Sequence, residues 1–362
     1  MHIGVLSIFQ NYRDEHDDGA IMRGEMEIAL LAEDLGFDSY WATEHHFFGY
    51  SMCPDNLQWL TGVATKTKRI QVGTGAVIMP WNSPYRVAAK TALLDQQSGG
   101  RALLGFGRGL SRREYASFGI PMDEARGRFD EGTQLVIDAL RTGVMEADTS
   151  YFKQPRAALR PKPTASFDER VYSIGVSPES AVQAAVIKAR LMVLAQQPWE
   201  VFRDMALVPY QTKWRELHGT EPPPPVCGQL VFCDADADRA AELGERYVKN
   251  YFASVVEHYE IAGKHFQGTK GYEFYASAAD MITAIGLDEM ATMYASVNTF
   301  GTPDEIVARI EQQRSVLGCD HDVLTIVKYG GMSDAEAQRS MRLFAKEVMP
   351  RLRADRRGST AA

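Results

Sequence analysis

Acid–base chemistry is suggested by residues 44–48, a Glu-His-His-Phe-Phe run that sets a carboxylate and two imidazoles beside two aromatic rings. Histidine donates or accepts a proton near neutral pH, so the run predicts a catalytic histidine next to an aromatic ligand pocket. The alternative is a histidine pair that bonds only the loop backbone, with both phenylalanines in the core. The run alone does not decide between the two.

Anion binding is suggested by residues 105–110, Gly-Phe-Gly-Arg-Gly-Leu, in which Arg108 stands between two glycines. Glycines let backbone amides approach a ligand closely, and the planar guanidinium of arginine binds two phosphate oxygens at once. The run does not match the GxGxxG dinucleotide fingerprint. It predicts a phosphate site of another kind, with a surface arginine in a flexible turn as the alternative.

Two further runs would complete a nucleotide site. Small residues at 73–76 would let a flat ring approach the backbone, although a tight turn without a ligand would use them equally well. Ser177 followed by Pro178 is typical of a helix start, where free amides and the helix dipole favour phosphate. Most such serines only cap a helix, and Glu179 must point outward for the phosphate interpretation to hold.

All four runs follow strands in a regular alternation of strands and helices. Strands are expected at Ile3–Ile8, Phe37–Thr43, Ile70–Val72 (turning through Met79), Ala102–Phe106, Val171–Gly175, Leu191–Leu194, Val226–Phe232 and Asp322–Val327. Helical segments separate nearly all of them, which indicates a parallel sheet, and eight units favour a closed (β/α)8 TIM barrel. Because active sites of such barrels lie at the carboxyl ends of the strands, the runs are expected to meet there.

Helices and insertions complete the predicted barrel. Helices are expected at Glu25–Leu35, Asn56–Thr65, Val87–Gln97, Asp123–Leu140, Pro178–Lys188, Trp199–His218, Ala235–Ser254, Thr302–Leu317 and Asp334–Leu352. Two segments exceed ordinary connector lengths, 143–170 after the fourth strand and 257–293 after the seventh, and we place both outside the barrel. The whole chain, 1–362, is expected to form one domain.

Composition argues against several classes of protein. The formal charge is −8, from 39 Lys and Arg against 47 Asp and Glu, which argues against nucleic acid as the main partner. The four cysteines form no CxxC pair, so no zinc site, redox dithiol or other metal site is predicted, and a reducing cytoplasm fits. The N-terminus lacks the apolar core of a signal peptide, and no stretch approaches a membrane span.

Several stretches of the chain resemble the bacterial luciferase family. They are GFDSYWATEHHF, VGTGAVIMP, LLDQQSGGRALLGFGRGL and GTPDEIVARI, with weaker similarity in VYSIGVSPESA and RLFAKEVMPRL. Together they cover most of the chain and leave the two insertions unmatched. The joint occurrence of the 44–47 run, the Asp95–Arg101 stretch and the Gly-Arg-Gly turn, in this order and spacing, makes the resemblance specific.

The resemblance implies a (β/α)8 barrel that binds reduced FMN delivered by a separate flavin reductase. In the family, dioxygen adds to the flavin at C(4a), and the resulting peroxide oxidises the substrate. For this chain the resemblance therefore implies a monooxygenase that acts on a hydrophobic small molecule. Hydroxylation, epoxidation and Baeyer–Villiger insertion are all compatible with it.

The resemblance also implies roles for particular residues. His45 matches the catalytic histidine, and we expect Glu44 to orient this cluster. Arg108 and Ser177 match residues that contact the FMN phosphate, and the Gly75-Ala76 bond matches a non-prolyl cis peptide under the isoalloxazine. The residues expected to hold the cofactor are Gly75, Ala76, Gly107, Arg108, Gly109, Leu110, Ile174, Val176 and Ser177.

Departures from luciferase change what is expected of the substrate. Gly107 and Ser111 stand where luciferase has cysteine and tyrosine, and Glu114 replaces an aspartate. The 257–293 segment is also unlike luciferase, so light emission is not expected. Gly107 leaves room for a bulkier or cyclic substrate. The aromatic residues expected to favour an apolar substrate, each of which would equally fit the core, are Phe9, Phe47, Phe48 and Trp81.

Two alternatives keep the barrel but change the activity. One is a deazaflavin-dependent oxidoreductase that transfers hydride without dioxygen, and the other is a non-catalytic flavin-binding barrel. The resemblance also implies assembly that is at least dimeric, through helices of the second and third units. Trp59 and Leu60 are candidates for that interface, although both would equally fit the core.

Overall fold

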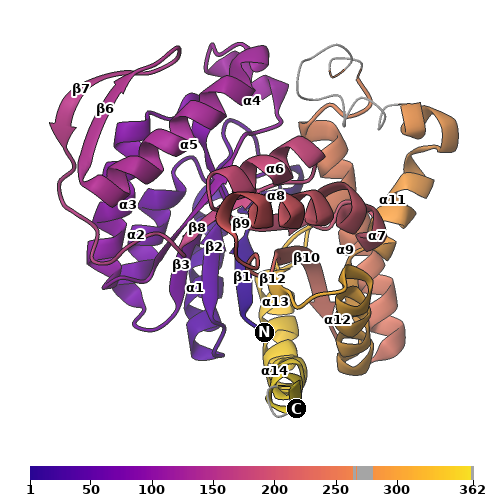
Figure 1. Cartoon of the computed structure of the whole chain (residues 1–362). Coiled ribbons are helices and arrows are strands. Elements are labelled where there is room, and N and C mark those ends of the chain that lie inside the picture. The colour runs from indigo at the N-terminus through magenta and orange to yellow at the C-terminus, as the bar shows by residue number, and fades with distance from the viewer. Residues whose placement is uncertain (264–265, 267–279, 360–362) are drawn as a thin grey trace.

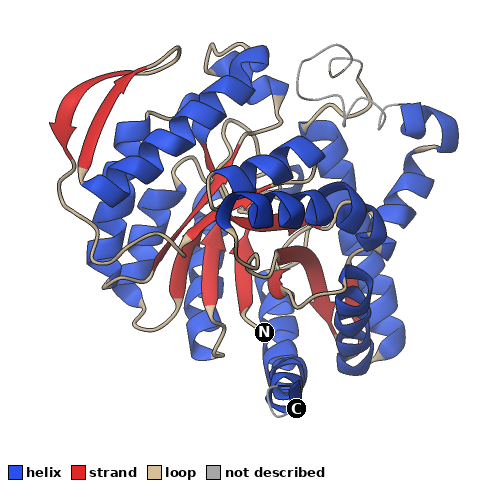
Figure 2. Ribbon diagram, viewed as in Figure 1, coloured by secondary structure: helices blue, strands red, loops and turns tan. Residues whose placement is uncertain are grey.

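Eight parallel strands form one closed ring in the computed structural model, which describes residues 1–263, 266 and 280–359 (Figures 1 and 2). In ring order they are β1 (Ile3–Ser7), β2 (Ser39–Ala42), β3 (Gln71–Thr74), β5 (Ala102–Gly107), β8 (Val171–Ile174), β9 (Arg190–Leu194), β10 (Val226–Cys233) and β12 (Asp322–Ile326). Each pairs in parallel with the next, and β12 closes the ring on β1, with Val323 opposite Ile3. The predicted (β/α)8 barrel is confirmed.

Helices surround this ring (Figure 2). They are α1 (Asp18–Asp34), α2 (Asn56–Lys66), α3 (Pro84–Ser98), α4 (Arg112–Ser117), α5 (Ala125–Thr142), α6 (Pro178–Val186), α7 (Trp199–Phe202), α8 (Val208–His218), α9 (Ala237–His258), α11 (Leu287–Ser296), α12 (Pro303–Leu317), α13 (Asp334–Leu343) and α14 (Met349–Ser359). A turn of π-helix joins α7 to α8, and another joins α13 to α14. The long helices predicted at 199–218 and 334–352 are therefore present, with one wide turn in each.

Side-chain caps set where several helices begin. Asp17 accepts the Ala20 N–H at 3.0 Å, so α1 begins at Asp18 and not at the predicted Glu25. The sequence pattern missed this first part because its apolar residues are few and its polar ones face solvent. Thr302 and Glu305 form a reciprocal capping box at the start of α12, where the predicted boundary is correct.

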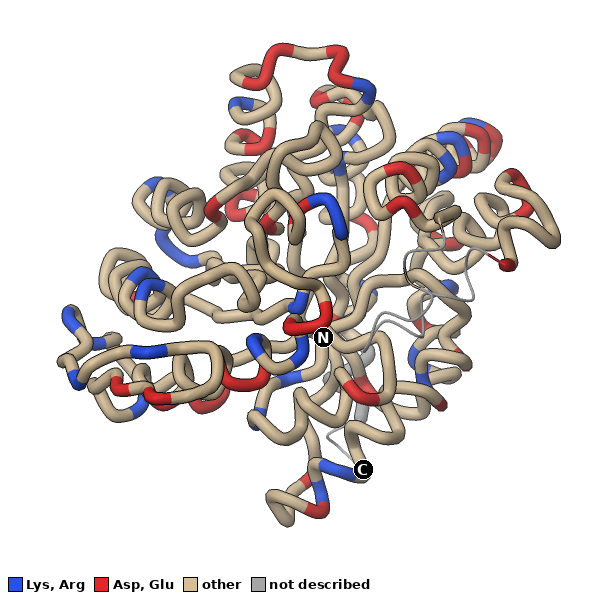
Figure 3. Tube along the Cα trace, turned by 90° about the horizontal axis from the view of Figure 1, so that it is seen from above, with Lys and Arg blue, Asp and Glu red and all other residues tan. Residues whose placement is uncertain are grey.

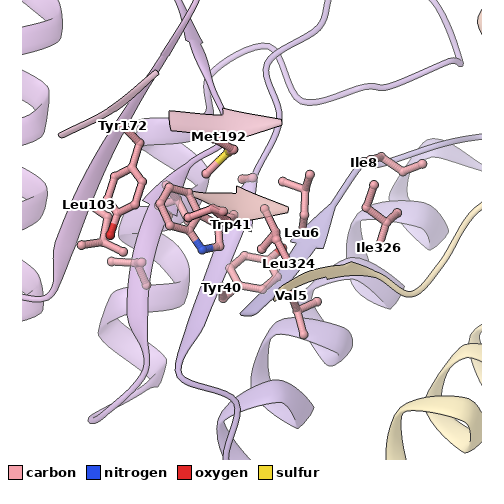
Figure 4. Close-up of a cluster of buried hydrophobic side chains, with 14 of the residues drawn as sticks. Val5, Leu6, Ile8, Tyr40, Trp41, Leu103, Tyr172, Met192, Leu324 and Ile326 are labelled. Atoms are coloured by element: carbon pink, nitrogen blue, oxygen red, sulfur yellow. The ribbon is translucent and has the colours of Figure 1, made fainter. Parts of the chain in front are cut away.

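Large side chains pack the barrel interior (Figure 4). Trp41 of β2 lies edge-on to Tyr172 of β8, with ring centroids 4.9 Å apart, and these strands are not neighbours, so the contact crosses the barrel. Gly73 of β3 makes room for the indole, because a Cβ at that position would lie 2.4 Å from Trp41. Since the interior is filled, as in other barrels of this type, a ligand has to bind at one end.

The first predicted insertion, 143–170, lies outside the barrel and contains an antiparallel hairpin of β6 (Val144–Asp148) and β7 (Lys153–Ala158) (Figure 1). The sequence pattern did not predict this hairpin, because β7 is largely exposed and contains Pro155. Proline is tolerated there because each strand of a two-stranded sheet is an edge strand. Arg170 ends the insertion and pairs with the buried Asp95 of α3 at 2.5 Å. This ion pair ties the insertion back to the barrel.

The second predicted insertion, 257–293, is described only in part, since residues 264–265 and 267–279 lie outside the described residues. At its start α9 continues to His258, and near its end α11 packs against α9, with the Phe252 and Tyr294 rings 5.0 Å apart. The sequence pattern predicted no helix at α11. It also missed β11 (Thr299–Gly301), which pairs with β10 in parallel but is only three residues long.

Charged residues of both signs are spread around the outer helices (Figure 3).

Of the two residues considered for a dimer interface, Leu60 is fully buried in the core, and Trp59 is half-buried and edge-on to Phe9, with ring centroids 5.0 Å apart. The core interpretation is therefore correct for Leu60. Within the described residues, none of the helices combines the length and apolar character needed to cross a membrane.

Candidate active site at the barrel mouth

One cavity at the carboxyl ends of the barrel strands, here called the inner cavity, contains all the site residues predicted from the sequence. They are Glu44, His45, Gly75, Ala76, Gly107, Arg108, Gly109, Leu110, Ile174, Val176 and Ser177. These residues follow or end β2, β3, β5 and β8, which are neighbours in the ring. The topology therefore brings together the four runs that the sequence places far apart.

His45 is held by a buried carboxylate from another part of the chain. Its Nδ1 lies 3.1 Å from Oε1 of Glu114, at the start of α4, and the same oxygen accepts the His46 backbone N–H at 2.7 Å. Burial alone would raise the pKa of Glu114, but the imidazoles of His45 and His258 outweigh it and hold that pKa well below its ordinary value. Because an ionised carboxylate only accepts, Nδ1 of His45 carries the hydrogen.

The other ring nitrogen of His45, Nε2, is the one that can exchange a proton. Its Nε2 lies 3.4 Å from the hydroxyl of Tyr259, which also lines the inner cavity. With Nδ1–H fixed on Glu114, Nε2 is the ring nitrogen that can take or give a proton. In the sequence Glu114 stands out only as a replaced aspartate, and its position 69 residues beyond His45 gives no sign of the contact.

Glu44 is a positioning residue in this arrangement. Its carboxylate is buried and lies within hydrogen-bond distance of the nitrogens of four partners, which are His46, Ile78, Trp81 and Asn82. It therefore orients the second histidine and the segment that follows Gly75-Ala76. The prediction that Glu44 orients the histidine cluster holds for His46, whereas the carboxylate on His45 is Glu114.

A shelf of small residues lies beside His45. The Gly75-Ala76 peptide bond is cis, as predicted. Gly107 of β5 packs against the shelf, since a Cβ there would lie 2.9 Å from Ile78 Cδ1 and 3.4 Å from Ala76 Cβ. The glycine thus serves close packing of β5 against the shelf as well as leaving space in the cavity. Together these residues offer a surface that a flat ring can approach.

Anion-binding groups lie where β5 and β8 end. Ser177 caps α6: its Oγ accepts the Ser180 N–H at 3.3 Å, and Ser180 Oγ accepts the Ser177 N–H at 3.0 Å. Both serines and Arg108 line the inner cavity, and Glu179 is exposed and does not line it, as the phosphate interpretation requires. Ser180 was missed, although the Ser-x-x-Ser spacing is the signal of such a box.

Tyrosines next to His45 form a further part of the wall of the inner cavity, here called the tyrosine wall. They are Tyr50, Tyr251, Tyr259 and Tyr294, and apolar side chains of Ile8, Leu194, Leu230, Val255 and Ile326 lie among them. Tyr50 and Tyr251 share a hydrogen bond of 2.8 Å between their hydroxyls, and burial raises the pKa of Tyr251 to about 12. These hydroxyls stay neutral, so the wall combines aromatic surface with hydrogen-bonding groups.

The aromatic residues expected from the sequence lie elsewhere. Phe9 is buried against Trp59, Phe47 is 59% exposed, and the indole of Trp81 donates to Glu44 at 2.7 Å. Phe48 lines a neighbouring cavity. None of the four lines the inner cavity in the described part of the chain, so the expectation that they form the substrate pocket is wrong. For Phe9 the alternative, a core position, is correct.

Replacing Glu114 with glutamine should make the protein less stable in a pH-dependent way. Folding lowers the pKa of this carboxyl, so its ionised form stabilises the fold above the ordinary pKa of 4.5, and the contribution is lost as the pH falls. We expect the free energy of unfolding to drop by about 1–3 kcal/mol at pH 7, from loss of charged hydrogen bonds. Urea denaturation measures the difference.

The difference between wild type and Glu114→Gln should narrow as the pH falls from 5 to 3.5. The exposed Glu179 provides the matched control, and Glu179→Gln should unfold like the wild type at each pH. A Glu114→Gln deficit that stays constant over this range would contradict the role given to the carboxylate.

Comparisons with known proteins show which family the sequence matches and which proteins it is similar to. The model of the family described as luciferase-like monooxygenase matches residues 1–321. The alkanal monooxygenase alpha chain of Aliivibrio fischeri is 25% identical over 336 residues, 88% of this chain and 90% of the relative. Limonene 1,2-monooxygenase of Rhodococcus erythropolis is 23% identical over 361 residues, 95% of this chain and 85% of the relative.

Solved structures share the fold over nearly the whole chain. Monooxygenase RslO1 from Streptomyces bottropensis superposes with a TM-score of 0.82 at 25% identity, covering 97% of this chain and 100% of its own. The oxygenating constituent of 3,6-diketocamphane monooxygenase from Pseudomonas putida, in complex with FMN, gives 0.76 at 18% identity, with 97% and 98% covered. An F420-dependent secondary alcohol dehydrogenase gives 0.70 at 20% identity, with 96% and 98% covered.

Proposed function

The chain belongs to the luciferase-like monooxygenase family, and from this premise we propose that it is the oxygenase of a two-component system. It takes reduced FMN from a separate flavin reductase and uses dioxygen to oxidise a hydrophobic small molecule. The observation that carries the proposal is one cavity with an anion site, a shelf of small residues and a buried, oriented histidine.

The donor set fits FMN. Arg108 supplies a guanidinium, and the start of α6 supplies the positive end of the helix dipole and the Ser177 hydroxyl, a combination that phosphate favours. The Gly75-Ala76 shelf would hold the isoalloxazine, and Gly107, Gly109, Leu110, Ile174 and Val176 would flank it. When bound, reduced FMN supplies the two electrons that activate dioxygen.

His45 and the tyrosine wall would both lie beside the isoalloxazine, since the Tyr259 hydroxyl is 3.4 Å from Nε2 of His45. Nε2 of His45 holds or moves the proton that accompanies oxygen transfer, while Glu114 fixes the ring through Nδ1. The tyrosine wall receives the substrate and excludes water, since its apolar and aromatic side chains leave few charged groups there. The substrate is therefore neutral and largely apolar, with a group that accepts a hydrogen bond.

Oxygen uptake with alternative reduced cofactors tests the proposal. Purified protein supplied with photoreduced FMN should consume dioxygen and convert members of a panel of terpenes, ketones and aldehydes. Because an F420-dependent enzyme shares the fold, reduced F420 is the matched comparison, and fluorescence titration gives the affinity for each cofactor. Tight binding of F420 with hydride transfer and no dioxygen uptake would replace the proposal with the deazaflavin alternative. Binding of FMN without any turnover of the panel would favour a non-catalytic barrel.

The proposal also covers the assembly of the protein and its location in the cell. We propose that residues 1–362 act as one domain, in the cytoplasm, as a homodimer that receives reduced FMN by diffusion or contact from its reductase. Leu60 is excluded from the dimer contact because it is fully buried. A sedimentation experiment that finds only the 40.3 kDa species at micromolar concentration would contradict the dimer.

A further inference from the structure

A second cavity adjoins the inner one, and a cluster of imidazoles stands in the wall between them. His45 and Tyr50 line both cavities, Glu114 lines the inner one, and His258 lines the second, here called the outer cavity. The wall therefore has a group facing each side. His258 ends α9 and takes no part in the chemistry assigned above.

Three metal-binding groups converge in this wall. Glu114 lies between the two histidines, with Oε1 3.1 Å from Nδ1 of His45 and Oε2 3.9 Å from Nε2 of His258. One ligand atom from each of the three residues lies within 4.8 Å of the others. They come from the loop after β2, from α4 and from α9, so their convergence is a product of the fold and not of local sequence.

His258 is a buried imidazole whose ring nitrogens take no part in a hydrogen-bond network of the described residues. It is only 3% exposed, and within the described residues neither of its ring nitrogens has a hydrogen-bond partner. Its ring stacks on Tyr50, with centroids 4.3 Å apart and planes 10° from parallel, so it is firmly placed. This placement leaves Nε2 of His258 3.9 Å from Oε2 of Glu114.

We propose that His45, Glu114 and His258 form a binding site for one divalent transition-metal ion of the Zn²⁺ type. Two imidazoles and one carboxylate are a ligand set that Zn²⁺, Co²⁺ and Ni²⁺ accept, with further coordination positions left to solvent. Mg²⁺ and Ca²⁺ prefer oxygen ligands and are disfavoured by the two nitrogens. Binding needs only a small movement of His258 and His45 toward Glu114, because the three groups already face one another.

The outer cavity gives the ion a path that avoids the cofactor. Asp14, Asp18 and Glu257 line it and attract a cation, while Arg13 and Arg113 oppose it, so the affinity is moderate. When the ion binds Nδ1 of His45, the hydrogen of that nitrogen moves to Nε2, so the imidazole stays neutral and Nε2 can no longer accept a proton. The ion then acts as a reversible inhibitor, a consequence that rests on the proposed function of His45.

Metal titration of the flavin-free, full-length protein tests the site without relying on the proposed function. Calorimetry with Zn²⁺ and visible absorption with Co²⁺ should show one ion per chain, and Mg²⁺ should show none. His258→Asn should weaken Zn²⁺ binding at least about 10-fold. The matched control is His218→Asn, since His218 lies on α8 and bonds the Ala185 carbonyl at 2.8 Å, and it should bind like the wild type.

Unchanged Zn²⁺ affinity in folded His258→Asn protein would overturn the site. X-ray absorption of the zinc-loaded wild type gives a test that does not depend on a variant folding. Two imidazole ligands are expected, and none would refute the proposal. Because neither measurement uses flavin or dioxygen, a failure here is distinct from a failure of the monooxygenase proposal.

Discussion

Replacing His45 with asparagine should lower product formation about 10²–10⁴-fold, the usual contribution of a positioned acid–base group. The reason is geometric, because Nδ1 is committed to Glu114 while Nε2 lies beside the hydroxyl of Tyr259, which lines the inner cavity. FMN binding should be retained, since the residues proposed to hold the phosphate and the ring lie at the ends of β3, β5 and β8 and at the start of α6. Single turnovers with reduced FMN and dioxygen measure product formed per dioxygen consumed.

His46 is the matched comparison for this experiment. It neighbours His45 in the chain, but it bonds Glu44 and does not line the inner cavity. His46→Asn should therefore lose much less product than His45→Asn. In His45→Asn, dioxygen consumption should continue with release of hydrogen peroxide in place of product. Turnover equal to that of the wild type would overturn the role of His45.

The barrel was predictable because its strands carry a strong local signal. Buried parallel strands are short apolar runs, and in this chain helices with clear periodicity separate them. The β6–β7 hairpin has no such signal, since β7 is exposed and its pairing is decided by β6 alone. The three residues of β11 also lack a local signal, and they form a strand only because β10 extends past the ring and pairs with them.

The part of the site at the strand ends was predictable for a related reason. Residues such as His45, Arg108 and Ser177 follow recognisable strands, and the barrel topology itself brings strand ends together. Glu114 and Tyr251 carry no comparable signal, because they lie on helices whose inward face is fixed by tertiary packing. A spacing of four residues, about one helical turn, puts Tyr251, Val255 and Tyr259 on the same side of α9. The sequence does not tell that this side faces the cavity, because that depends on where α9 packs.

Glu44 shows that adjacency in sequence does not decide which side chains meet. Glu44 precedes His45 directly, but its carboxylate bonds His46 and the loop after β3. The carboxylate that serves His45 comes from α4, which the chain reaches only after two more barrel strands.

Replacing Arg108 with methionine should weaken FMN binding about 10–100-fold, which corresponds to loss of about 1.5–3 kcal/mol from a charge-assisted hydrogen bond. Methionine keeps much of the unbranched, apolar part of the side chain and removes only the guanidinium. Riboflavin provides the matched ligand, because it has the same ring without the phosphate. Its affinity should be the same for Arg108→Met and the wild type if Arg108 acts on the phosphate.

The control variant is Arg112→Met, four residues further along. Arg112 is exposed and pairs with Glu260 at 2.7 Å, outside the inner cavity, so its loss should leave both affinities unchanged. Fluorescence quenching of each flavin gives the four dissociation constants that the comparison needs. An equal loss of FMN and riboflavin affinity in Arg108→Met would mean that Arg108 shapes the cavity rather than binding phosphate. The anion site would then have to rest on the start of α6 alone, where Ser177 and Ser180 already bond each other and offer a weaker hold on a doubly charged group.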